Sequence, residues 1–124
     1  MNKKESREDY LEAILVLERK KNGRVKSIDV ANELSFSKPS VSIAMKKLKE
    51  EGLINIDKDG SIHLTDNGRV IAEKTLEKHE FLTNFFISLG IDPLMAEEEA
   101  CEIEHALNEL TFNKFREYVE RNKK

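Results

Sequence analysis

The stretch SIDVANELSFSKPSVSIAMKKLKEEG, residues 27–52, predicts two short helices joined by a tight turn. Apolar residues recur at helical spacing over residues 28–34, and Ser27 precedes them as the expected N-cap. Residues 35–37 (Ser-Phe-Ser) interrupt this pattern. The helical spacing then resumes and continues until Gly52, so a second helix follows almost at once.

The second of these helices presents hydroxyl and lysine side chains on one face. Ser37 is its expected N-cap, and Pro39 lies near its first helical position. Its apolar positions are Val41, Ala44, Met45 and Leu48. Its exposed face carries Lys38, Ser40, Ser42, Lys46, Lys47 and Lys49. Small hydroxyls can approach phosphates and base edges, and lysines neutralise phosphate charge, so the pattern indicates a helix-turn-helix whose second helix reads DNA. The alternative is a helical hairpin with a solvated lysine face.

Residues 53–64 favour the helix-turn-helix, because they predict a β-hairpin. Apolar and polar residues alternate, a turn follows at Asp59-Gly60, and the alternation returns. A hairpin directly after a reader helix makes a winged helix-turn-helix. Lys58 is expected at its tip, and His63 is expected at an exposed strand position rather than as a ligand. The predicted DNA-binding residues are Ser37, Lys38, Pro39, Ser40, Ser42, Lys46, Lys47 and Lys58.

Longer helices are predicted on both sides of this segment. Ser6 is the expected N-cap of the first, with Asp9 three residues later in a start that resembles a capping box. This helix ends near Asn22. After the hairpin, Thr65 and its neighbour are expected to cap a long helix over about residues 67–89.

The remaining sequence predicts two more helices, one behind Asp92 as N-cap and one from about Thr111. The predicted fold is therefore mostly α, with a winged helix-turn-helix DNA-binding domain over residues 1–64 and a helical domain over residues 65–124. A surplus of large aromatic residues in the second domain suggests a homodimer. These are Phe81, Phe85, Phe86, Phe112 and Phe115.

Composition excludes several classes of protein. The 124 residues carry a net charge of -3, with 13 Lys/Arg against 11 Asp/Glu in residues 1–64 and 8 against 13 in residues 65–124. One cysteine excludes an internal disulfide and favours a reducing cytoplasm. No apolar run is long enough to span a membrane, and the charged N-terminus is unlike a signal peptide.

Residues 101–105 (Cys-Glu-Ile-Glu-His) offer three types of metal ligand. On a helix, Cys101, Glu104 and His105 project from one face, because residues three and four apart are neighbours. Thiolate, carboxylate and imidazole are the side chains that bind transition metals. The alternative is a solvated helix face that happens to include a cysteine and a histidine.

Other potential ligands lie far away along the chain. Asp9 and Glu12 are three residues apart in the first helix, where they either complement the helix dipole or provide a pair of carboxylate ligands. His79 lies in the middle of the long helix, where a structural, hydrogen-bonded histidine is the alternative to a ligand.

Taken in order, four motifs resemble the family of the diphtheria toxin repressor and the manganese transport regulator. They are Asp9-Tyr10-Leu11-Glu12, Ser37-Lys38-Pro39-Ser40-Val41-Ser42, Lys78-His79-Glu80 and Cys101-Glu102-Ile103-Glu104-His105. In that family, ligands from the first, long and fifth helices bind one metal centre. The resemblance implies that the metal ligands here are Asp9, Glu12, His79, Cys101, Glu104 and His105.

The resemblance combines two branches of the family. Asp9 and Glu12 are similar to the manganese branch, whereas Cys101 is similar to the iron branch. The chain resembles the short, two-lobed form, without the SH3-like domain of the iron branch. The implied cofactor is a divalent transition metal, Fe2+ or Mn2+, with Co2+, Ni2+ or Zn2+ as substitutes.

The function that this implies is a cytoplasmic repressor of metal-ion homeostasis, a homodimer that binds a palindromic double-stranded DNA operator when metal is bound. The alternative is a winged-helix regulator that responds to an organic ligand. An enzyme is not expected, because no phosphate cradle or nucleophile motif is present and a saturated ligand set leaves no open catalytic position.

Overall fold

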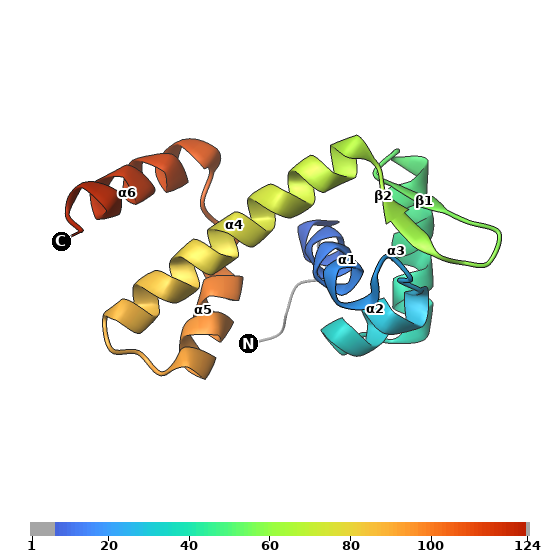
Figure 1. Cartoon of the computed structure of the whole chain (residues 1–124), viewed down its shortest axis with the longest axis horizontal. Helices are drawn as coiled ribbons and strands as arrows, with labels where there is room; N and C mark the ends of the chain where they lie inside the picture. The colour runs from blue at the N-terminus through green and yellow to red at the C-terminus, as the bar shows by residue number, and fades with distance from the viewer. Residues whose placement is uncertain (1–6, 124) are drawn as a thin grey trace. The chain divides into compact units, whose positions relative to one another are not determined.

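The computed structural model describes residues 7–123 (Figure 1). The chain forms two compact units, residues 1–74 and residues 75–124, which are here called the first and second units. The elements are α1 (Arg7–Lys21), α2 (Ser27–Leu34), α3 (Lys38–Glu50), β1 (Ile54–Ile56), β2 (Ile62–Leu64), α4 (Asp66–Ser88), α5 (Pro93–Glu104) and α6 (Glu109–Arg121). The prediction of a mostly α chain with a hairpin behind its third helix is confirmed. The α4 helix begins in the first unit and continues into the second.

The first unit has its own apolar core. Helices α1, α2 and α3 contact one another, α1 also contacts β2, and α3 contacts β1. The largest fully buried side chains of this unit are Leu11, Ile14, Leu15, Val25, Val30, Val41, Met45, Ile54 and Ile62. Burying these aliphatic groups contributes the main stabilisation of the unit, about 1.5–3 kcal/mol for each large side chain.

The caps of the two short helices differ from each other. Ser37 Oγ accepts a hydrogen bond from the Ser40 backbone N–H at 3.3 Å, which confirms the predicted cap of α3. The prediction for α2 is wrong by one residue, because Lys26 is the N-cap and Ser27 is the first helical residue. The Asp29 carboxylate, which accepts from the Lys26 backbone N–H at 2.9 Å, makes the cap instead. Ser6, the predicted cap of the first helix, lies outside the described residues.

The hairpin is short and lies on the core through one strand. Its strands pair antiparallel, with Ile54 opposite Leu64 and Ile56 opposite Ile62. The Ile62 N–H also donates to the Val25 carbonyl at 2.7 Å, in a bridge outside the two strands. The alternation of the sequence therefore places isoleucine side chains inward while the tip of the hairpin remains exposed.

The start of α4 lies directly against the base of the hairpin. Thr65 Oγ1 donates to the Gly52 carbonyl at 2.7 Å and accepts from the Gly68 N–H at 3.1 Å, so Thr65 caps α4 and closes the hairpin. The helix approaches so closely that a Cβ atom on Gly68 would lie 2.0 Å from the Leu53 carbonyl oxygen. Only glycine fits at this position.

Replacing Gly68 by alanine is expected to lower the free energy of unfolding by about 3 kcal/mol, because the overlap is with backbone and cannot be relieved by a rotamer change. Urea unfolding of the whole chain measures the effect. The matched control is Asn67→Ala, at the neighbouring exposed helical position, which is expected to change stability by less than about 0.5 kcal/mol. Equal stability of the two variants would contradict the close approach.

The second unit is built around aromatic side chains. Leu82, Ala100 and Phe112, from α4, α5 and α6, are buried together, and Phe81, Phe86 and Phe115 are among the partly buried residues packed against them. Phe81 makes edge-to-face contacts with Phe112 and Phe115, at centroid distances of 5.6 and 5.7 Å. Four of the five phenylalanines that suggested a dimer surface therefore belong to the unit's own core, and the fifth, Phe85, contacts the ring of Phe115.

Helix boundaries in the second unit follow local cap chemistry. Gly90, at φ +94°, ends α4 in a conformation that favours glycine. The Asp92 carboxylate accepts from the backbone N–H groups of Leu94 and Met95, as predicted for the start of α5. The last helix begins two residues before the predicted Thr111, because Asn108 is its N-cap and accepts from the Thr111 N–H at 2.8 Å.

Candidate metal centre and nucleic-acid interface

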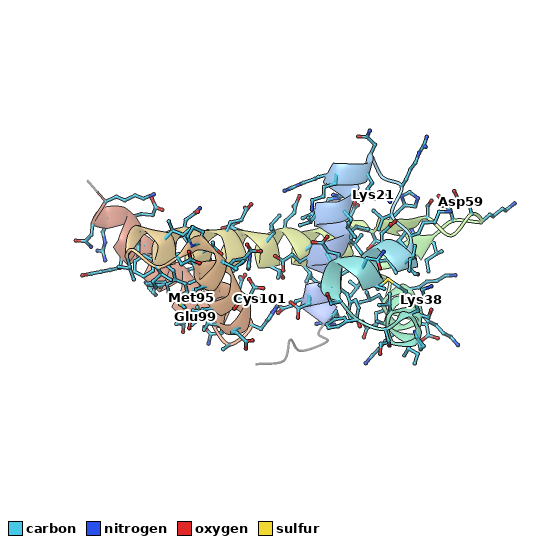
Figure 2. All side chains as sticks on the ribbon, turned by 90° about the horizontal axis from the view of Figure 1, so that it is seen from below. Lys21, Lys38, Asp59, Met95, Glu99 and Cys101 are labelled. Atoms are coloured by element: carbon cyan, nitrogen blue, oxygen red, sulfur yellow. The ribbon has the colours of Figure 1, made fainter. Side chains whose placement is uncertain are left out.

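The last turn of α5 carries the predicted thiolate, carboxylate and imidazole. Glu104 is the final residue of the helix and His105 is its C-cap, while Cys101 lies one turn earlier. Figure 2 labels Cys101 on this helix, and its side chain is half-buried. Cys101 and Glu104 are helical, as the spacing requires, whereas the helix ends one residue before His105.

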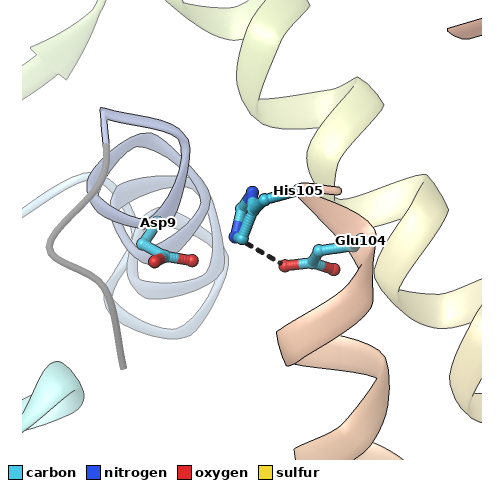
Figure 3. A group of neighbouring side chains, drawn as sticks. All are labelled: Asp9, Glu104 and His105. Carbon is cyan, nitrogen blue, oxygen red and sulfur yellow. Dashed lines mark ion pairs between the residues drawn. The ribbon is translucent and has the colours of Figure 1, made fainter. Parts of the chain in front are cut away.

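Glu104 is the centre of a buried polar group in the second unit. Its side chain is completely buried, and each of its carboxylate oxygens pairs with a different imidazole. His79 Nδ1, from α4, lies 3.2 Å from Oε2, and His105 Nε2 lies 3.3 Å from Oε1. Figure 3 shows the ion pair between Glu104 and His105. One histidine from α4 and a carboxylate and a second histidine from the end of α5 thus lie together.

This group has the chemistry of a metal centre. A buried carboxylate is costly unless it is paired or coordinates a cation. Imidazole nitrogen and carboxylate oxygen are ligands for Fe, Mn, Co and Zn, and a carboxylate can use both of its oxygens. The donor set of His79, Glu104 and His105 therefore fits a divalent transition metal.

The two predicted carboxylates of the first unit lie on α1. Asp9 is buried and Glu12 is half-buried, and the two are separated by one helical turn. Figure 3 also draws Asp9 on its helix. Glu8 and Asp9 occupy the first turn, where a carboxylate complements the positive end of the helix dipole, whereas Glu12 lies beyond that turn.

The α3 helix exposes most of the predicted DNA-binding residues. Ser37, Lys38, Pro39, Ser42, Lys46 and Lys47 are all exposed. Ser40 is half-buried, and its hydroxyl accepts a hydrogen bond from Ser37 Oγ at 3.0 Å, so it is part of the cap. Lys38, labelled in Figure 2, is the first residue of the helix.

The hairpin tip carries alternating charges. Lys58 is exposed, as predicted, between Asp57 and Asp59. His63 is half-exposed, and its Nε2 lies 2.7 Å from an Asp57 carboxylate oxygen. The Ser61 backbone N–H and hydroxyl both donate to Asp59, which lowers the pKa of that carboxyl. The two acidic side chains of the tip therefore contact His63 and Ser61 of the same hairpin.

Two residues near this interface are not among the DNA-binding residues that the sequence predicts. Lys26 Nζ donates to the Asp59 backbone carbonyl at 2.7 Å, which links the start of α2 to the hairpin. Ile43 lies on the exposed face of α3. The spacing of the buried positions Val41, Met45 and Leu48 places residue 43 off the core stripe, and this spacing is the signal in the sequence that indicates its exposure.

Two family models together match nearly the whole chain. Residues 4–62 match the N-terminal DNA binding domain of the iron dependent repressors, and residues 65–124 match their metal binding and dimerisation domain. The chain belongs to the iron-dependent repressor family. These are metal-dependent, DNA-binding transcriptional regulators, and the predicted family, winged-helix fold and class of function are confirmed at this level.

Individual relatives agree with this assignment. The chain is 34% identical over 118 residues to an uncharacterized HTH-type transcriptional regulator of Methanocaldococcus jannaschii, covering 94% of each chain. It is 32% identical to the transcriptional regulator MntR of Escherichia coli O157:H7, covering 97% of this chain and 77% of MntR. The solved structure of the manganese regulator SloR has a TM-score of 0.82 at 28% identity, over 93% of this chain and 54% of SloR. The chain thus spans about half the length of that solved relative.

Within residues 7–123, none of the helices combines the length and apolar character that a membrane crossing requires.

Proposed function

We propose that this protein is a repressor whose DNA binding is switched on by Fe2+ or Mn2+, held by Asp9, Glu12, His79, Cys101, Glu104 and His105. The observation that carries the proposal is the buried Glu104 carboxylate, paired on both oxygens with His79 and His105. The family's metal-binding domain covers these three residues. The residue assignments and the division into residues 1–64 and 65–124 are part of the proposal.

The three residues of the second unit provide the fixed part of the ligand set. His79 projects from the middle of α4, and Glu104 and His105 end α5, so packing of the two helices around Leu82 and Ala100 holds the donors in place. When bound, the metal supplies positive charge that two or more carboxylates share. The existing pairs already order the donors, which reduces the conformational entropy that binding must remove.

The α1 carboxylates provide the coupling to the DNA-binding part. Asp9 and Glu12 belong to the helix whose apolar face forms the core under α2 and α3. If side chains of both units bind the same metal centre, the relative placement of the units depends on metal. The metal shifts this equilibrium only because it binds one placement more tightly than the others. In a dimer, this restriction would hold the two reader helices about 34 Å apart. Because the two half-sites of a palindrome are one turn of DNA apart, this distance favours binding to a palindrome.

A second copy of the chain is proposed to bind at the corner between α4 and α5. Four large apolar side chains lie exposed there, within nine residues of the sequence: Ile87, Leu89, Leu94 and Met95. The phenylalanines are used inside the unit, so these side chains replace them as the proposed dimer contact. An apolar centre that includes methionine is typical of protein interfaces.

The alternative of an organic corepressor makes no use of the histidine-carboxylate group. We propose no enzymatic activity, and a cytoplasmic location, in keeping with a DNA-binding regulator. Elemental analysis of the purified protein, followed by anaerobic DNA-binding assays with Mn2+, Fe2+, Co2+ and Zn2+ in turn, separates a metal from an organic switch. Full DNA binding in excess chelator would disprove the metal switch.

Cys101 is expected to favour Fe2+ or Co2+ over Mn2+ as activator. A thiolate prefers later and softer metals, whereas the oxygen-rich remainder of the set still allows Mn2+ binding. Replacing Cys101 by glutamate should therefore raise the relative response to Mn2+. Replacing it by alanine should raise the concentration needed for activation by roughly tenfold for every metal. Titrations of DNA binding against each metal measure both effects.

Cobalt gives an independent check of the same residue. Thiolate ligation of Co2+ produces an intense near-ultraviolet charge-transfer band, which should appear on titration and be absent in Cys101→Ala. If Co2+ activates DNA binding without that band, Cys101 is a small apolar residue of the half-buried helix surface and not a ligand.

A further inference from the structure

One large apolar side chain in the middle of the reader helix α3 is not buried in the core. Ile43 is 71% exposed, the highest value among the large hydrophobic residues that the structure describes. The buried stripe of α3 consists of Val41, Met45 and Leu48. Exposing an isoleucine forgoes the stabilisation that its burial would give, so packing within the fold does not explain an isoleucine at this position.

The neighbours of Ile43 place it at the centre of the proposed DNA surface. It follows Pro39 by four residues and precedes Lys46 by three, so helical spacing puts the three side chains on one face. Ser42 and Lys47 border the same face, and all five residues are exposed. A helix lying in the major groove with its lysines near phosphates would direct Ile43 towards the base edges.

We propose that Ile43 reads a thymine in each half-site by contact with the C5-methyl group. This inference rests on the proposed function, since it requires α3 to bind in the major groove. An aliphatic side chain has no hydrogen bond to offer, and the thymine methyl is the apolar group that base pairs present in that groove. Ile43 therefore determines sequence preference, whereas the lysines around it contribute affinity for any duplex.

The test begins with the whole chain and random DNA duplexes. Binding sites are selected with wild-type protein and the most effective of Mn2+, Fe2+ and Co2+. Each thymine of the selected site is then replaced by uracil, which removes only the methyl group. One thymine per half-site is expected to be sensitive, with a loss of affinity of roughly fourfold for one half-site and roughly fifteenfold for both, the value of one buried carbon per contact.

The variant Ile43→Ala should bind the thymine and uracil duplexes equally. Alanine favours the helix and the position is exposed, so the fold should be unchanged by circular dichroism. The dependence of affinity on salt should keep its slope, because no phosphate contact is lost. The matched control is Ile28→Ala, the same change at an exposed isoleucine of α2, which should retain the preference for thymine.

The outcomes separate the inference from the function on which it rests. If wild-type protein selects no sequence with any of the metals, the proposed function fails and the inference with it. If a sequence is selected and Ile43→Ala still distinguishes thymine from uracil as wild type does, the methyl contact is wrong while the repressor function stands.

Discussion

Replacing Glu104 by glutamine is expected to raise the metal concentration needed for DNA binding by roughly 100-fold or more. The substitution removes the charge that pairs with His79 and His105 and leaves a neutral amide as a poor metal ligand. Fluorescence anisotropy with a selected duplex, measured across a metal titration, gives the shift directly. His79→Ala should give a comparable loss, because it removes a donor from the other helix.

The matched control is Glu99→Gln, an exposed carboxylate on the same helix, labelled in Figure 2. It should respond to metal as wild type does. The DNA affinity of metal-loaded wild type should also fall steeply as salt is added. A plot of the logarithm of the association constant against the logarithm of the salt concentration should have a slope of about -0.9 for each phosphate that a lysine such as Lys46 or Lys58 neutralises. An unchanged metal response in both Glu104→Gln and His79→Ala would show that the buried group is structural only.

Replacing Leu94 by aspartate is expected to convert the dimer into a monomer. Leu94 is 69% exposed at the corner of α4 and α5, and two charges facing each other across a symmetric contact would repel. Loss of the second half-site should then lower DNA affinity by roughly 100-fold. Sedimentation equilibrium at micromolar concentration measures the first effect, and anisotropy the second.

The α6 helix supplies a closely matched control. Leu110 is 68% exposed and, like Leu94, is the second residue of its helix. An aspartate complements the helix dipole at either position, so neither variant should lose stability. Leu110→Asp is expected to remain a dimer. If Leu110→Asp is a monomer while Leu94→Asp remains a dimer, the dimer interface lies on α6 and not at the corner between α4 and α5.

Much of the fold was predictable because its signals are local. Helical spacing and cap residues placed α3 behind Ser37 and α5 behind Asp92, and strict alternation placed the hairpin. The spacing of Cys101, Glu104 and His105 likewise required only that residues 101–105 be helical. Such features depend on interactions between residues a few positions apart, so they can be predicted from the order of the residues alone.

Other features were decided by tertiary contacts. Packing against α5 and α6 determined that the phenylalanines fill the second unit's core and that other apolar residues stay exposed. The pairing of His79 with Glu104 joins residues 25 positions apart, and the need for glycine at position 68 arises from the Leu53 carbonyl. The sequence by itself thus determined the elements and the ligand types, whereas only the tertiary structure decided which side chains meet, because contacts between distant residues depend on packing that no local pattern records.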